Sequence, residues 1–194
     1  MRRQLQSFVR ARRSLLFWPQ RIATWERRRR EREAVAGGRI RAARPPVTSA
    51  LTITPHYLDA FTITTQFVAS PREWMMACFE RGVERSGRDL IFGRILALNT
   101  ASDGAPGTVA GWCVVREDDR ILTIAADGRR VEVNLVMERV DAGMRLTTAV
   151  HEHSRVGHFV WRNLSRVHRR LAPGVLRTGA AILRADRESA HEYA

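Results

Sequence analysis

The hydrophobic pattern along this chain of 194 residues changes from helical spacing to strict alternation near residue 107. Residues 58–66 are rich in β-branched and aromatic side chains and predict a first strand. Apolar residues at helical spacing then predict one helix from Ser70 to about Arg85 and a shorter amphipathic helix over 90–98. After residue 107, alternating positions predict four strands, over 108–116, 120–126, 129–139 and 144–153.

The residues at the ends of these segments agree with the predicted elements. Ser70, Pro71 and Glu73 give an N-cap, a proline at the first helical position and a capping box. Asp127-Gly128 predicts a two-residue hairpin loop. Asp118-Asp119 and residues 141–143 predict two further hairpins, so the four strands should form an antiparallel meander with one face toward a core.

The C-terminal part predicts a long helix over 156–170 with an apolar stripe that includes His168. Pro173-Gly174 predicts an interruption, and residues 175–184 a second helical piece. The resulting order is a strand, two helices, a four-stranded meander and a long terminal helix. We therefore expect an α+β helix-grip fold, in which a curved antiparallel sheet wraps around the C-terminal helix. The space between sheet and helix is a natural ligand cavity.

Charge divides the chain into parts. The first 44 residues hold 14 Arg and 3 Glu, a net charge of +11, which leaves +2 of the total +13 for the remaining residues. We predict an Arg-rich N-terminal helical arm and linker over 1–46, with Gly37 and Gly38 in the linker, a helix-grip domain over 47–185, and a polar tail over 186–194 that frays. The nearly neutral domain does not itself predict a nucleic-acid-binding surface.

The arm supports three interpretations. It is a solvated helix or tail, an amphipathic helix that docks on an anionic membrane, or a segment attracted to nucleic acid phosphates through residues 1–44. Arg12-Arg13 begins like a twin-arginine export signal, but no apolar region follows, so we predict no export. Two isolated cysteines and the lack of any run of about 20 apolar residues predict a cytoplasmic protein, peripheral to the inner membrane face under the second interpretation.

Few residues carry recognisable chemistry. The spacing of His151, His153 and His158 matches no established metal site, and no glycine-rich phosphate loop occurs, so we predict neither a metal nor a cofactor. His168 is either a structural residue, a polar anchor in a pocket, or the one plausible general base.

Three further residues are candidates for binding a ligand. Trp112 and Trp161 are each interpreted as pocket wall or as core. Arg145 begins a series with Thr147 and Ala149 that we expect to face inward, where its guanidinium could meet a ligand carboxylate.

Six short stretches of the chain stand in a characteristic order and spacing: Tyr57–Phe61, Glu73-Trp74, Gly111-Trp112, Arg145–Val150, Val160-Trp161-Arg162 and His168-Arg169. Together they resemble a family of uncharacterised actinobacterial domains of the DUF type, near the START-like, polyketide-cyclase-like (SRPBCC) superfamily. The resemblance covers about residues 55–181 and has no single diagnostic motif. It implies a helix-grip fold and small-molecule binding in a cavity, with no assigned reaction.

These observations favour a noncatalytic protein that binds a small apolar or lipid-like molecule through Trp112, Arg145, Trp161 and His168. A cyclase-like or hydrolase-like enzyme that uses His168 is one alternative. An adaptor that docks on membrane or nucleic acid through its basic arm is another.

Overall fold

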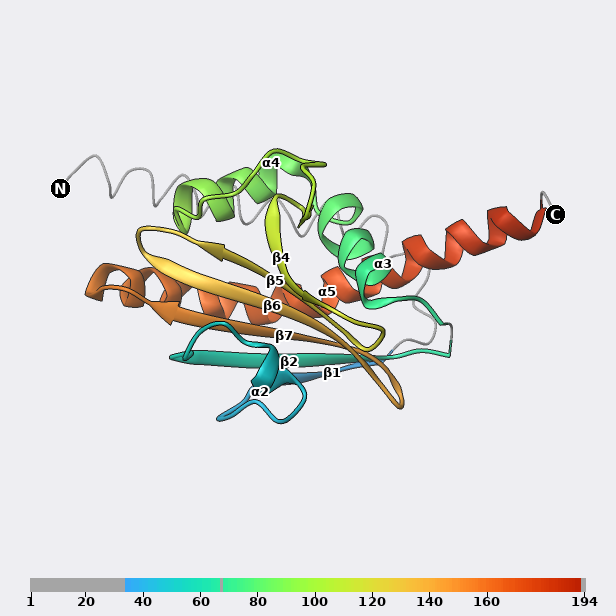
Figure 1. The fold of residues 1–194 in the computed structure, drawn as a ribbon, viewed down its shortest axis with the longest axis horizontal. Coiled ribbons are helices and arrows are strands. Elements are labelled where there is room, and N and C mark those ends of the chain that lie inside the picture. The colour runs from blue at the N-terminus through green and yellow to red at the C-terminus, as the bar shows by residue number, and fades with distance from the viewer. Residues whose placement is uncertain (1–33, 67, 193–194) are drawn as a thin grey trace. The chain divides into compact units, whose positions relative to one another are not determined.

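The computed structural model describes residues 34–66 and 68–192 (Figure 1). Contacts divide the chain into two units, Met1–Arg32 and Glu33–Ala194, and every described residue belongs to the second unit. Most of the predicted arm, with its three interpretations, lies outside the described residues. No helix within the described ranges is long and apolar enough to cross a membrane.

Seven strands form a single antiparallel sheet in the order β1-β2-β7-β6-β5-β4-β3. The longest pairing joins β6 to β7, from Val131↔Glu152 to Val140↔Gly143. The strands are β1 (Val35–Arg39), β2 (Tyr57–Thr64), β3 (Thr108–Val109), β4 (Trp112–Glu117), β5 (Ile121–Asp127), β6 (Val131–Val140) and β7 (Gly143–Glu152).

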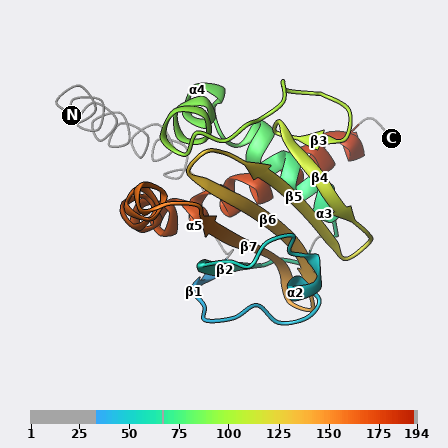
Figure 2. The same ribbon diagram turned by 60° about the vertical axis from the view of Figure 1, so that its left-hand side comes forward.

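Helices cover both faces of this sheet. The 38-residue helix α5 (Arg155–Glu192) contacts β1, β2 and β7, and it also packs against α3 (Pro71–Met76) and its π-helical continuation η1 (Ala77–Arg81). The short helix α2 (Val47–Ala50) packs against β5 and β6, on the other side of the sheet (Figure 2). A short helix, α4 (Arg85–Arg88), and its π-helical continuation η2 (Asp89–Ile95) precede the meander. The sheet followed by its long terminal helix is the helix-grip fold.

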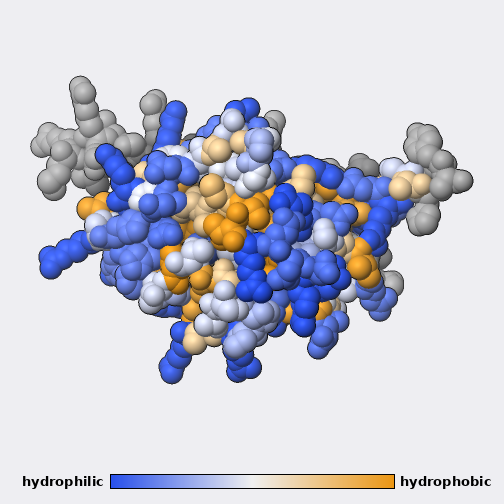
Figure 3. All heavy atoms as spheres, in the orientation of Figure 1, coloured by the Kyte–Doolittle hydropathy of each residue, from blue (hydrophilic) through white to orange (hydrophobic). Residues whose placement is uncertain are grey.

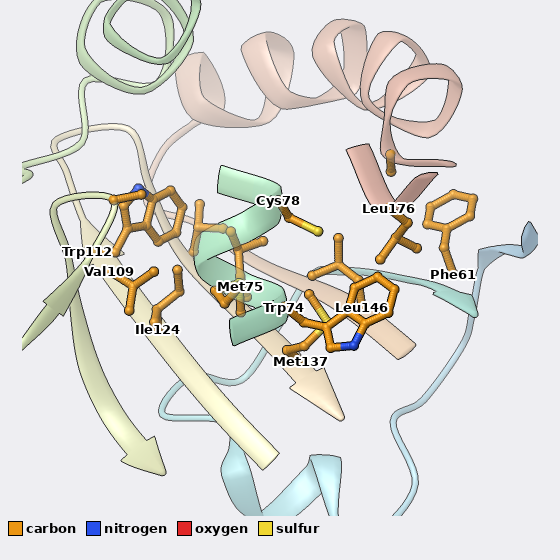
Figure 4. Packing of buried hydrophobic residues seen from close by; sticks show 14 of the residues in the cluster. Phe61, Trp74, Met75, Cys78, Val109, Trp112, Ile124, Met137, Leu146 and Leu176 are labelled. Carbon is orange, nitrogen blue, oxygen red and sulfur yellow. The ribbon is translucent and has the colours of Figure 1, made fainter. Parts of the chain in front are cut away.

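The main core lies between the sheet and the helices. Trp74 and Cys78, from α3 and η1, are fully buried between the strands and α5 (Figure 4). They share one cluster with Met137 and Leu146 of the sheet and Leu176 of α5. Large side chains therefore occupy this part of the sheet–helix interface, where the sequence suggested a ligand cavity. The face drawn in Figure 3 is largely hydrophilic, with small hydrophobic patches between charged residues.

The capping box and the meander are confirmed. The Ser70 side chain accepts from the Glu73 backbone N–H, and the Glu73 carboxylate accepts from the Ser70 N–H. The predicted strand 108–116 is divided into β3 and β4 at Ala110 and Gly111, which both have positive φ. The predicted two-residue loop at Asp127-Gly128 is wrong, because Asp127 pairs with Glu132 and four residues separate them.

The predicted interruption at Pro173 is also wrong, since α5 runs through it to Glu192. A proline removes one helical hydrogen bond. Here the turns on both sides are fixed by tertiary packing, with Ala172 and Leu176 buried in the core. Residues 186–192 of the segment predicted to fray are helical as well, and the Arg81 guanidinium donates to both carboxylate oxygens of Asp186 at 2.8 Å.

Gly37 and Gly38 lie in a strand and not in a linker. They belong to β1, where Gly37 pairs with Phe61 and Gly38 with Ala60. Gly37 has φ +149, and a Cβ there would lie 2.0 Å from the carbonyl oxygen of Ala60. Only glycine allows this close approach, so the sheet begins within residues 1–46, which the sequence assigned to the arm and linker.

Candidate functional site

A pocket of about 670 Å³ lies between the N-terminal half of α5 and the sheet edge formed by β1, β2 and the end of β7. Tyr57 and Trp161 provide its aromatic surface. Most of the other lining side chains are basic or can become so. They are five arginines, Arg39, Arg155, Arg162, Arg166 and Arg169, and three histidines, His56, His153 and His158.

The helix places four of these arginines together. Positions 155, 162, 166 and 169 fall within an arc of about 60° at 3.6 residues per turn. The buried stripe of α5, which includes Val160 and Leu164, lies on a different face of the helix. Arg39 reaches the pocket from β1, so both the helix and the sheet edge supply guanidinium groups.

The five arginines form no ion pair with a carboxylate among the residues that the structure describes. By contrast, the three histidines are engaged. His158 Nδ1 lies 2.9 Å from Glu152, His56 Nδ1 lies 3.8 Å from the same carboxylate, and His153 Nε2 lies 2.9 Å from Asp127. The pocket therefore concentrates positive charge. Glu152, the one carboxylate among the described residues that line it, contacts His56 and His158 and none of the five arginines.

A polar network lies behind the aromatic wall of the pocket, which Tyr57 and Trp161 form. Asp59, which is 0% exposed, accepts a hydrogen bond from the Tyr57 hydroxyl at 2.7 Å. Its carboxylate also lies 3.2 Å from Nε2 of His168, and the same Nε2 lies 3.1 Å from the Thr148 hydroxyl. The strands position this set, because Asp59 of β2 pairs with Thr148 of β7.

The pocket and the network meet at Tyr57. Its hydroxyl accepts a hydrogen bond from Nη1 of Arg169 at 3.1 Å, while the Arg39 guanidinium lies over its ring, 5.6 Å from the centroid. Burial and, to a smaller extent, the hydrogen bond to Asp59 raise the pKa of Tyr57 above its usual value. Tyr57 is thus a neutral hydroxyl that links an arginine in the pocket to a buried carboxylate.

Trp161 separates the pocket from His168. Its ring meets Tyr57 edge to face with centroids 5.2 Å apart, and its centroid lies 5.7 Å from that of His168. The indole Nε1 is buried and has no hydrogen-bond partner among the described residues. Of the four candidate binding residues, Trp161 lines the pocket, whereas His168 lies behind the wall and is not among the lining residues.

The structure places the other two candidates elsewhere. Trp112 is buried in the core on β4, where it contacts Phe92 edge to face at 5.0 Å. The expectation that Arg145 faces inward is wrong, because Leu146 is the neighbour that points into the main core. Arg145 lies on the opposite face, 3.4 Å from Glu138. Burial raises the pKa of Glu138, and Arg145 partly opposes that shift.

The histidines considered for a metal site have separate partners. His151 Nδ1 lies 2.8 Å from the Thr54 carbonyl oxygen, His153 contacts Asp127, and His158 contacts Glu152. Within the described ranges, Asp127, Glu132 and His153 place ligand atoms within 4.8 Å of one another. These side chains lie at or near the surface, where such groupings are common without an ion.

Sequence reasoning missed most of this site, although two signals were available. Asp59 interrupts an apolar strand, and a carboxylate in such a position needs partners once it is buried. The spacing of Arg155, Arg162, Arg166 and Arg169 places one charge on one helix face. No sequence signal indicated that β1 would bring Arg39 to the same place.

No family model matches the chain, and no curated protein matches it either. Among solved structures, the chain is similar to the crystal structure of CalU16 from Micromonospora echinospora, at 19% sequence identity, over 78% of this chain and 96% of that chain, with a TM-score of 0.26. Similarity at this level does not establish a shared fold or function. The assignment of this domain to the helix-grip class therefore rests on its own topology.

Proposed function

We propose that the domain binds a small amphipathic anion in the pocket between α5 and the sheet edge. The observation that carries this proposal is the group of five arginines without carboxylate partners among the described residues. Guanidinium groups match the geometry of carboxylate and phosphate oxygens, and they form stronger hydrogen bonds with such charged acceptors than with neutral ones. A ligand that brings negative charge would relieve the mutual repulsion of the arginines.

The volume and the aromatic wall support a ligand larger than a simple ion. About 670 Å³ falls within the range of small-molecule sites. The rings of Tyr57 and Trp161 offer apolar contact beside the charged groups. The sequence suggested a small apolar or lipid-like ligand, whereas this lining favours a molecule with an acidic group and an aromatic or aliphatic body.

Binding is favoured over catalysis by the position of His168. Its Nε2 faces Asp59 and Thr148, and the side chain is not part of the pocket lining. A general base must reach the proton that it removes, directly or through one water. No described contact brings His168 to the pocket in that way.

Isothermal titration calorimetry of the full chain tests the proposal with three probes: 1-naphthyl phosphate, 1-naphthol and inorganic phosphate. We expect 1-naphthyl phosphate to bind at one molecule per chain and more tightly than either fragment, because only this probe supplies both charge and ring. Equal binding of 1-naphthol, or no binding of 1-naphthyl phosphate, would overturn the proposal.

Variants locate the site. Arg162→Gln/Arg166→Gln removes two lining charges and should weaken 1-naphthyl phosphate binding about tenfold, since a partly exposed ionic contact contributes up to about 1 kcal/mol. Arg170→Gln/Arg177→Gln is the matched control, because it also removes two charges from exposed positions of the same helix, and neither residue lines the pocket. An equal loss in both variants would show that net charge, and not this pocket, holds the probe.

A further inference from the structure

The five pocket arginines differ in how firmly they are held. Arg155, Arg162 and Arg166 are exposed, and no polar contact to their side chains occurs among the described residues. Arg169 is half-buried and hydrogen-bonded through Nη1 to Tyr57. A guanidinium that is already oriented loses less conformational freedom when it binds an anion than one that moves freely in solvent.

The chemistry of Tyr57 gives this contact a fixed direction. Arginine has no acceptor, so the Tyr57 oxygen must accept from Arg169. The phenolic hydrogen is then available to Asp59, whose oxygen lies 2.7 Å away. Hydrogen bonds therefore run from Arg169 to Tyr57 and from Tyr57 to Asp59, and the Arg169 guanidinium keeps its other N–H groups for a ligand.

Asp59 is itself fixed by its surroundings. It is completely buried, its strand β2 is paired with β7, and its carboxylate contacts His168 of α5. The orientation of the Tyr57 hydroxyl is thus determined by the rigid interface between the sheet and α5. The Arg39 guanidinium over the Tyr57 ring brings a second positive charge to the same side chain.

We propose that Arg169 is the residue that anchors the anionic group of the ligand, and that Asp59 positions it through Tyr57. The inference rests on the proposed function and names the specificity-determining contact of the same pocket. Arg155, Arg162 and Arg166 add long-range attraction, whereas Arg169 fixes where the anion sits.

The test measures the affinity of the full chain for 1-naphthyl phosphate in single and double variants. Arg169→Gln should weaken binding about 30-fold. Arg166→Gln should weaken it only about threefold, because the Arg166 guanidinium is exposed and is not held in place by a hydrogen bond among the described residues. Arg169→Lys keeps the charge but loses the planar fork, and should recover only part of the loss. Tyr57→Phe keeps the contacts of the ring with Trp161 and Arg39 but removes the hydroxyl that holds Arg169, and should weaken binding about fivefold.

A double-mutant cycle separates positioning from a general structural effect. Adding Tyr57→Phe to Arg169→Gln should cost almost nothing more, because the residue that Tyr57 positions is already gone. Adding Tyr57→Phe to Arg166→Gln should still cost about fivefold. Thermal unfolding of each variant confirms that it is folded at the temperature of the titration.

Two results would overturn the inference and leave the proposed function standing: equal losses for Arg169→Gln and Arg166→Gln, or full additivity of Tyr57→Phe with Arg169→Gln. If the wild-type chain does not bind 1-naphthyl phosphate at all, the proposed function fails and the anchoring role fails with it.

Discussion

Replacing Tyr57 with phenylalanine tests whether the buried network contributes to stability. The ring and its contacts with Trp161 and Arg39 remain, and only the hydroxyl is lost. That hydroxyl donates at 2.7 Å to a carboxylate that is 0% exposed. A hydrogen bond to a charged group contributes about 1.5–3 kcal/mol, so the free energy of unfolding should fall by about 2 kcal/mol. For a chain of this length the Tm should fall by about 4–8 °C.

Urea unfolding, followed by tryptophan fluorescence and by circular dichroism, measures the change. The midpoint should fall while the slope with urea stays constant, because Phe does not alter the surface exposed on unfolding. A loss below about 0.5 kcal/mol, the lower limit for an ordinary hydrogen bond, would show that the buried Asp59 carboxylate does not depend on this hydroxyl.

The raised pKa of Tyr57 also predicts how the stability of the protein changes at alkaline pH. Burial and the bond to Asp59 raise the pKa of Tyr57 in the folded state above its value of about 10 in the unfolded chain. The unfolded chain therefore loses this proton first, so the contribution to stability is complete below pH 10 and is lost as the pH rises above it. Stability should fall less steeply in Tyr57→Phe than in the wild type. In Tyr193→Phe, which leaves Tyr57 as the one tyrosine, absorbance of tyrosinate should appear only as the protein unfolds.

Three further predictions concern the core and the end of α5. Cys113 is exposed, whereas Cys78 is fully buried and burial raises its pKa to about 12, so a disulfide reagent should label one thiol per folded chain and not two. In Gly179→Ala the new Cβ would lie 2.4 Å from the Cys78 sulfur, so urea unfolding should show a loss of about 1–3 kcal/mol in the free energy of unfolding. The control Gly93→Ala, whose new Cβ would have nothing within 4 Å, should show no such loss. Equal effects of the two substitutions would contradict this packing. Arg81→Ala breaks an exposed ion pair with Asp186 of α5 and should lower the free energy of unfolding by less than about 1 kcal/mol. It should nevertheless speed amide hydrogen exchange after residue 185, because the C-terminal end of α5 loses this contact. Unchanged exchange would mean that the ion pair does not hold the end of the helix in place.

Local patterns predicted much of the fold. Alternation and hairpin residues located the meander, and Ser70 with Glu73 fixed the start of α3, because these signals act over a few residues. Pro173 misled the prediction because packing on both sides of it outweighs one lost hydrogen bond. Gly37 and Gly38 looked like a linker because the close approach to Ala60 depends on a partner strand that is distant in sequence.

The site was harder to predict for a similar reason. On β7, Leu146 and Thr147 are both almost completely buried, although they face opposite sides of the sheet. A strand buried on both faces does not reveal which face holds the main core, and Arg145 was assigned to the wrong one. Trp161 was a candidate from the sequence and lines the pocket, whereas Asp59 becomes informative only when β2, β7 and α5 are assembled.

Nuclear magnetic resonance of the ¹⁵N-labelled full chain during titration with 1-naphthyl phosphate shows where the probe binds. We expect chemical shift changes that saturate at one probe per chain and cluster at Arg39, at Tyr57 and along residues 152–169, with the Trp161 indole among them. No shifts there, or shifts confined to residues outside the pocket, would contradict a binding site between α5 and the sheet edge.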